Sequence, residues 1–379
     1  MKLLNSSDET EAVEKDDAFP GFLSPAVITL LLTIGLVAHI LAILGTRRAN
    51  RIRVENSRHV VPSFLLNSLL RIDMIAVIFF LIRGFLYPIP FFVDSAIWCD
   101  FSVSTSIFFT WSSGFANVLM CAERTFSVMA PFLHRQYATL RKVKVILGSM
   151  QAFAVVVCLL PTIGFGLYKI EVAEGYKCVS PGDLDVTVIN KYHLHFTIIF
   201  FCVGFSIMFS ILGFNMFIIY FIFHMRNKVA HLNVAVAPNP NDPKASSTNN
   251  ANRKSNSEMR FAIIMVFVSI AYTISWLPLY LERLLLALSF NLSPKAQSIG
   301  IWIHVFNYVI DPVIFVFLKR RNRTALKLVC AECYCCCQCE DYKRKIDEEL
   351  RMISNYGQTG LTDNTIQQHG TQDGEAELN

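Results

Sequence analysis

Residues 98–126 read WCDFSVSTSIFFTWSSGFANVLMCAERTF, an apolar stretch that is rich in small residues. Cys99 stands near its start, and the triplet Glu123-Arg124-Thr125 stands near its end. The 25 residues from Cys99 to Arg124 (124 − 99 = 25) would rise roughly 38 Å as a helix. That is about the thickness of a bilayer with its headgroups. The stretch therefore predicts a helix that places a thiol at one side of a membrane and an arginine at the other.

The composition places the whole chain in the membrane class, since 53% of its residues are hydrophobic and only 17% are charged. Several windows of about 20 residues are almost free of charge, which is long enough to span the hydrocarbon core. Backbone polar groups must pair internally in lipid, so each window should be a helix. The sequence thus predicts an all-α membrane protein, a seven-transmembrane helix bundle with spans near 24–45, 61–83, 97–127, 143–168, 194–224, 259–288 and 298–318.

Basic residues gather in alternate connections of this bundle, at 47–58, 135–144, 226–254 and 319–327. The positive-inside rule places these connections in the cytosol and the amino terminus outside. The connection at about 229–258 is also rich in Pro, Asn and Ser without an apolar period, so it should be disordered. Residues 1–20 lack a basic segment followed by an apolar one, so no cleaved signal peptide is expected. The predicted parts are an extracellular tail (1–23), the transmembrane domain (24–318), a short amphipathic eighth helix with a cysteine cluster (319–340) and a disordered cytoplasmic tail (341–379).

The 11 cysteines fall into three groups. The cysteines of the first group lie within the predicted spans and are expected to pack against neighbouring helices. Cys99 and Cys178 are the two that face the oxidising outside, so we expect a disulfide between them. The third group follows the basic stretch after the last span and comprises Cys330, Cys333, Cys335, Cys336, Cys337 and Cys339. At this position S-palmitoylation is favoured over a zinc site or free thiols. Asn5 and Asn291 begin tripeptides for N-glycosylation on the predicted outer side.

Several short motifs give the chain a resemblance to rhodopsin-like (class A) G-protein-coupled receptors over about residues 24–340. The resemblance rests on Cys99, Cys178, the Glu-Arg-Thr triplet, Ser275-Trp276-Leu277-Pro278, Asp311-Pro312-Val313-Ile314-Phe315 and the tail cysteines. Within this class the chain is most similar to prostanoid receptors. The similar features are the run SVMAPFLHRQYA after the triplet, LLPTIGFG at the end of the fourth span, GFS followed by Asn215 in the fifth, and Asp-Pro in the seventh.

The resemblance implies a polar cluster inside the membrane. A carboxyl in mid-membrane is costly, which makes Asp73 a candidate functional residue. Family spacing places it near Ser113, Asn307 and Asp311, and two carboxyls in a low dielectric need a cation, a shared proton or hydroxyl donors. An allosteric sodium ion suits oxygen ligands. A protonated, structural carboxyl pair is the alternative, and no other cofactor is expected.

The resemblance also implies an activation apparatus at the cytosolic end. Glu123, Arg124 and Thr125 are expected to couple to a heterotrimeric G protein. Glu258 matches the position where an acid of this class holds the arginine in the resting state, although a solvated surface glutamate is the alternative. Releasing that pair would open a cavity for a partner helix. The expected switch residues are Trp276, Pro278, Asp311, Pro312 and Phe315.

The ligand site is where the chain departs from prostanoid receptors. These receptors carry an arginine nine residues before the Asp-Pro pair, and here that position is Trp302 (311 − 9 = 302). An acidic lipid would take its charge partner from Arg83 or Arg283, although both could equally be interfacial residues. Ser106 stands where amine receptors have an aspartate, so amine ligands are not expected. The candidate ligand contacts are Arg83, Ser106, Arg283 and Trp302. Peptide ligands remain open.

We therefore expect a plasma-membrane receptor that couples an extracellular small lipid or peptide ligand to a heterotrimeric G protein, with arrestin and membrane lipids as further partners. A peptide-binding or orphan class A receptor is one alternative. A transporter or channel is another, although no internal repeat of the kind transporters show is present. No nucleophile–base motif or metal-ligand run indicates an enzyme. The net charge of +5 comes from the cytosolic connections and indicates no nucleic-acid partner.

Overall fold

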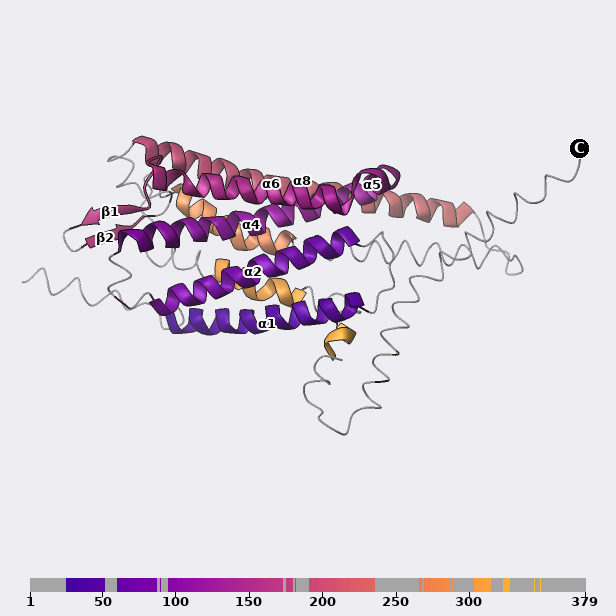
Figure 1. The fold of residues 1–379 in the computed structure, drawn as a ribbon. Coiled ribbons are helices and arrows are strands. Elements are labelled where there is room, and N and C mark those ends of the chain that lie inside the picture. Colours follow the sequence, from indigo (N-terminus) through magenta and orange to yellow (C-terminus); the bar gives the residue numbers. More distant parts are fainter. Residues whose placement is uncertain are drawn as a thin grey trace, which may run out of the picture.

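Helices occupy part of every predicted span. The computed structural model describes residues 25–51, 60–86, 89, 95–172, 175–179, 181, 191–235, 266–267, 269–285, 288, 303–314, 323–327, 344 and 348. The long helices are α1 (Pro25–Arg51), α2 (Val60–Leu86), α4 (Ala96–Met129), α6 (Leu140–Leu159) and α8 (Lys191–Ala235). Residues 269–285 and Ile303–Ile314 are helical within the last two spans. These helices lie side by side along one common direction (Figure 1).

Helix α4, which contains the stretch that opened the sequence analysis, lies in the middle of the bundle and packs against α2, α6 and α8. In the described part of the chain, four helices are long and apolar enough to cross a membrane: Ala26–Arg48, Val60–Leu86, Leu140–Ile163 and Tyr192–His224. The 34-residue α4 is not among them. Its buried residues include hydroxyls at Ser102, Thr110, Ser112 and Ser113, so its polar atoms face protein rather than lipid.

The outer surface of the bundle carries large apolar side chains that a water-soluble protein would bury. Val156, Phe209 and Met216 are each more than 60% exposed. Such an apolar surface is stable in contact with lipid tails and unstable in water. The exposed residues lie on helices whose opposite faces form the protein core, for example Cys158 on α6 and Ile211 on α8.

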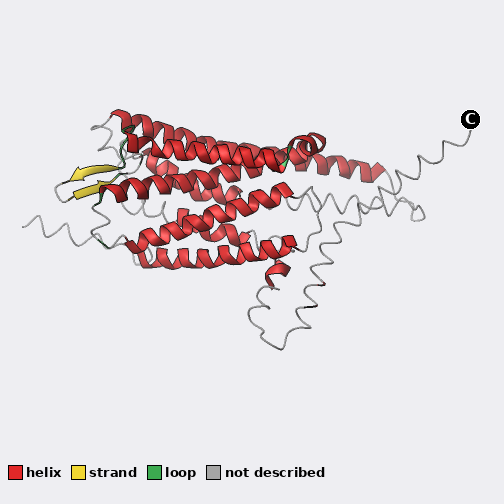
Figure 2. Ribbon diagram, in the orientation of Figure 1, coloured by secondary structure: helices red, strands yellow, loops and turns green. Residues whose placement is uncertain are grey.

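The fourth span is shorter than predicted. We expected it to run over 143–168, but α6 ends at Leu159 and a 3₁₀ turn, η3 (Leu160–Ile163), follows. Pro161 lacks the N–H that an α-helix needs, and Gly164 and Gly166 have φ angles of 93° and 117°, in the left-handed region. The chain then forms an antiparallel hairpin, β1 (Lys169–Val172) and β2 (Gly175–Cys178), which was not predicted and is drawn in yellow in Figure 2.

The fifth predicted span (194–224) agrees with the apolar stretch Tyr192–His224, but the helix that contains it is longer. Helix α8 continues to Ala235, so the first residues of the connection that we expected to be disordered (229–258) are helical. The short helix α5 (Pro131–Tyr137) follows α4, with proline in its first turn, where the missing N–H removes no helical hydrogen bond. Of the predicted eighth helix, residues 323–327 are described and helical.

Candidate functional site

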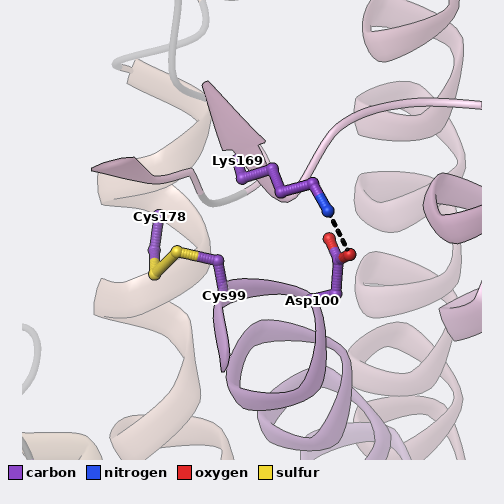
Figure 3. The surroundings of a disulfide bond; sticks show 4 residues. All are labelled: Cys99, Asp100, Lys169 and Cys178. Carbon is purple, nitrogen blue, oxygen red and sulfur yellow. Dashed lines mark hydrogen bonds and ion pairs between the residues drawn. A yellow bond between two sulfur atoms is a disulfide. The ribbon is translucent and has the colours of Figure 1, made fainter. Parts of the chain in front are cut away.

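The outer end of α4 is fixed to the hairpin by a covalent bond. Cys99 and Cys178 form a disulfide, with their Cα atoms 4.9 Å apart, which confirms the predicted pairing. The adjacent residue Asp100 accepts a hydrogen bond from Lys169 Nζ at 2.6 Å, from the facing strand of the hairpin. Figure 3 shows the two links side by side. Together they place the hairpin directly over the outer end of the central helix.

An arginine on α2 reaches across to α4 in the outer half of the bundle. Arg83 Nη1 donates to Ser106 Oγ at 2.9 Å, and that hydroxyl donates in turn to the Ser102 carbonyl at 2.6 Å. Both Arg83 and Ser106 were predicted as ligand contacts, and the structure brings them together. Arg71 on the same helix is exposed instead. The guanidinium of Arg83 is therefore directed towards the central helix.

The second predicted cation, Arg283, lies on helix 269–285, seven residues after Trp276 and hence on nearly the same face. Its Nε is 3.9 Å from Oε1 of Glu282. Glu282 is only 6% exposed, and neither carboxylate oxygen has a hydrogen bond in the described part of the chain. Glu282 was not predicted as a site residue, because neither its neighbours in the chain nor a motif indicates that it is buried. The outer half of the bundle thus contains a buried acid as well as arginines.

A cluster of aromatic rings lies inward of the arginines. Trp276 is fully buried, and its ring centroid is 3.9 Å from that of His304. The His304 ring also packs edge-on against Tyr308 and Phe80, and its Nδ1 makes no hydrogen bond to a described residue. Trp276 was predicted as a switch residue, whereas His304 was missed. Its only sequence signal is its position seven residues, two helical turns, before Asp311.

The predicted polar cluster is buried in the middle of the bundle. Asp73, Ser113, Asn307 and Asp311 are each at most 1% exposed. Asn307 Nδ2 donates to Asp311 Oδ2 at 3.2 Å, and the Ser113 hydroxyl lies close to Asp73 without the geometry of a hydrogen bond. Asn117, one turn after Ser113, is also buried and was not predicted.

This cluster has the chemistry of a site for a hard cation. Both Asp73 carboxylate oxygens, Ser113 Oγ, Asn307 Oδ1 and Asp311 Oδ1 are buried and have no hydrogen-bond partner among the described residues. Buried oxygens that lack donors are costly, and a sodium ion would satisfy several of them at once. The residues present therefore fit the ion that the sequence predicted.

At the other end of α4, a small charged network surrounds the predicted triplet. Arg124 Nε lies 3.0 Å from Glu123 Oε2, while the other oxygen of Glu123 lies 3.0 Å from His134 Nε2 on α5. Thr125 Oγ1 donates to the Cys121 carbonyl and, at 3.3 Å, to the Phe214 carbonyl on α8. His134 was not predicted, because its contact depends on how α5 folds back. The triplet is thus bound to two neighbouring helices.

Several predicted residues lie outside the described part of the chain, so the structure leaves their roles as predictions. They are Glu258 of the proposed lock, Trp302, the switch residue Phe315, the glycosylation candidates Asn5 and Asn291, and the tail cysteines at 330–339. Pro278 and Pro312, the two switch prolines, are helical residues of 269–285 and Ile303–Ile314.

Comparison with known proteins identifies the class. Residues 51–315, well over half of the chain, match the rhodopsin family of 7-transmembrane receptors, and the chain belongs to that family. It is thus a multi-pass membrane protein with a seven-helix fold, and a receptor rather than an enzyme, transporter or channel, as predicted.

Two individual proteins are similar to the chain, one in sequence and one in fold. The chain is similar to the mouse (Mus musculus) prostacyclin receptor, with 23% identity over 249 residues, which are 64% of this chain. It spans about half of that relative, 53% of its length. Its fold matches the crystal structure of squid rhodopsin with a TM-score of 0.62 at 15% identity, covering 86% of this chain and 92% of that one. These matches agree with the predicted resemblance to class A receptors of prostanoid type.

Proposed function

We propose that this chain is a plasma-membrane receptor, with its amino terminus outside, that binds an extracellular ligand carrying an anionic group and activates a heterotrimeric G protein. The proposal is supported by family membership, by the basic residues of alternate connections, and by the two ends of α4. One end has a disulfide, which requires an oxidising compartment, and the other has the Glu-Arg-Thr triplet.

The contact between Arg83 and Ser106 is the observation that supports an anionic ligand. An arginine that holds its guanidinium across two helices is ordered before a ligand arrives, so less conformational entropy is lost when a carboxylate binds. The resemblance to prostanoid receptors, and the prostacyclin receptor among the relatives, both favour an acidic lipid. Arg83 would then take the role of the arginine that prostanoid receptors carry where this chain has Trp302.

A peptide is the second candidate ligand, and Glu282 favours it. A buried carboxyl beside Arg283 gives the outer half of the bundle both signs of charge. A peptide with an ammonium and a carboxylate could satisfy Glu282 and Arg83 together, whereas an acidic lipid would offer no hydrogen-bond donor to the carboxylate oxygens of Glu282. The two ligand classes therefore make different demands on this residue.

A screen of acidic lipids and of peptides, with G-protein activation as the readout, tests both candidates. Arg83→Gln should weaken the response to an anionic agonist by about 10- to 100-fold, the effect of losing a charge-assisted hydrogen bond. Arg71→Gln is the matched control, since this arginine is exposed on the same helix. Equal losses in the two variants, or an agonist insensitive to Arg83→Gln, would contradict the assignment of Arg83. A response lost in Glu282→Gln would identify the peptide class.

We also propose that Asp73, Ser113, Asn307 and Asp311 hold an allosteric sodium ion. When bound, the ion supplies positive charge between the two carboxyls. The chain's own contribution is the set of buried oxygens without donors and the Asn307 amide that orients Asp311. Purified receptor should unfold at a higher temperature in sodium chloride than in choline chloride, and Asp73→Asn should remove the difference. A wild-type melting temperature that is equal in both salts would rule the ion out.

The inner end of α4 is proposed to meet the G protein, and afterwards arrestin. Arg124 is held by Glu123, which also contacts His134 of α5. A partner that draws Arg124 away from Glu123 must therefore act on α4 and α5 together. Arg124→Ala should abolish coupling to every G-protein class supplied, at unchanged surface density of the receptor.

A further inference from the structure

A thiol and a hydroxyl join the two helices that the proposed activation would separate. Cys121 on α4 and Ser269 on helix 269–285 lie with Sγ and Oγ 3.0 Å apart, and either atom can be the donor. Cys121 is 1% exposed and Ser269 is not exposed at all. The two residues are 148 positions apart in the chain, so only the packing of the bundle brings them together.

The contact lies within a junction of three helices. One turn after Cys121, the Thr125 hydroxyl bonds both the Cys121 carbonyl and the Phe214 carbonyl of α8. On the opposite helix, the Thr273 hydroxyl donates to the Ser269 carbonyl. The backbone on both sides is thus held by hydroxyls of the same helix. The side-chain atoms Sγ and Oγ are therefore positioned for each other across the helix–helix interface.

We propose that Cys121 and Ser269 are positioning residues that hold helix 269–285 against α4 in the silent receptor. The inference rests on the proposed function: a G protein that meets Arg124 needs room at the inner end of α4, and separation of α4 from helix 269–285 would provide it. Cys121 lies three residues before Arg124, and its contact with Ser269 does not involve Glu258, the predicted lock residue. A thiol forms a weak hydrogen bond, so the contact biases the equilibrium towards the closed form and still yields to a ligand.

Ligand-free signalling per receptor at the cell surface is the first test. Cys121→Ala and Ser269→Ala should each raise it by about two- to tenfold, which corresponds to one neutral buried hydrogen bond present in the closed state only. The double variant should signal no more than either single variant, because both remove the same contact. Cys121→Ser, which retains a donor, should stay near wild type.

A matched control separates this role from packing. Cys158→Ala removes another buried thiol, one that lies on α6 in the same hydrophobic core. It should leave ligand-free signalling unchanged. If Cys158→Ala raises output as much as Cys121→Ala does, or if the effects of Cys121→Ala and Ser269→Ala add, the pair has no positioning role.

Thiol labelling gives a readout that does not depend on a G protein. In a receptor whose Cys158, Cys202 and six tail cysteines are replaced by serine, N-ethylmaleimide should label Cys121 slowly, because the thiol is buried. Ser269→Ala should speed that labelling by about the factor by which it raises output. If Ser269→Ala leaves the labelling rate of Cys121 unchanged, the contact does not hold helix 269–285 against α4. If Ser269→Ala speeds up the labelling of Cys121 but no variant alters ligand-free signalling, the contact between the helices is supported. The proposed coupling to a G protein is then refuted.

Discussion

Removing the disulfide between Cys99 and Cys178 should lower the free energy of unfolding by about 3 kcal/mol, a value that follows from the length of chain that the bond restrains. The two cysteines are 79 residues apart, and a freely unfolding chain of that length would give about 4.5 kcal/mol. Much of that length is α4 and α6, which the membrane keeps helical. The segment that gains freedom is 164–178, or 15 residues (178 − 163 = 15). The 15-residue loop, and not the full 79-residue separation, therefore determines the expected loss of about 3 kcal/mol in the free energy of unfolding.

The ion pair beside the disulfide should matter much less. The side chains of Lys169 and Asp100 are 32% and 28% exposed, so water and salt screen their attraction. Pairs of this kind contribute about 1 kcal/mol or less. Asp100→Asn should therefore cost at most a third of what Cys99→Ala costs, although the two residues are neighbours in α4.

Thermal unfolding of purified receptor measures both effects. Cys99→Ala, Cys178→Ala and the double variant should melt at the same temperature, about 4 °C below wild type for a chain of 379 residues. Cys202→Ala is the control, since this thiol is exposed and free. The reasoning is refuted if the double variant melts within about 2 °C of wild type, or if Asp100→Asn costs as much as the disulfide variants.

Four further predictions concern other parts of the chain. Gly204→Ala should cost about 1–3 kcal/mol in thermal unfolding, because the new Cβ would lie 2.6 Å from Cζ of Tyr280. Tyr168→Phe should cost about 1 kcal/mol by losing the hydrogen bond to the Cys158 carbonyl. Burial raises the pKa of Tyr168 above that of unfolded tyrosine, which is about 10. The stabilisation from this hydrogen bond should therefore be complete below pH about 10 and be lost only at higher pH. Glu258→Ala should raise ligand-free second-messenger output about five- to 150-fold. Replacing the tail cysteines by serine should abolish labelling by a palmitate analogue.

The features that sequence reasoning predicted best depend on the chain's topology alone. The disulfide follows from which cysteines lie outside, and the spans follow from their apolar length. The polar cluster followed from family spacing, because Asp73, Ser113 and Asp311 each lie at a fixed depth in their own helix. In these cases the physical constraint acts on one segment at a time, so neighbouring segments need not be known.

The features that were missed depend on contacts between segments. Glu282 shows no local signal and His304 only its spacing from Asp311, since the packing of other helices makes both residues buried. The contact between Arg83 and Ser106 was not foreseen, although each residue was chosen, because helix rotation decides which side chains meet. The hairpin has strands of four residues, too short for alternation to be distinguished from chance. The end of α6 was misplaced because Pro161 was taken as part of the span.

The length of α8 determines the shape of the surface that a cytosolic partner meets. The helix continues for 11 residues beyond His224, where its apolar span ends (235 − 224 = 11), and so projects about 16 Å further. In Figure 1 its far end extends beyond the ends of α1, α2 and α4. A partner cannot dock on this side as it would on a flat plane. It has to present a protruding element that fits beside α8, and the projecting turns limit the directions from which that element can approach Arg124.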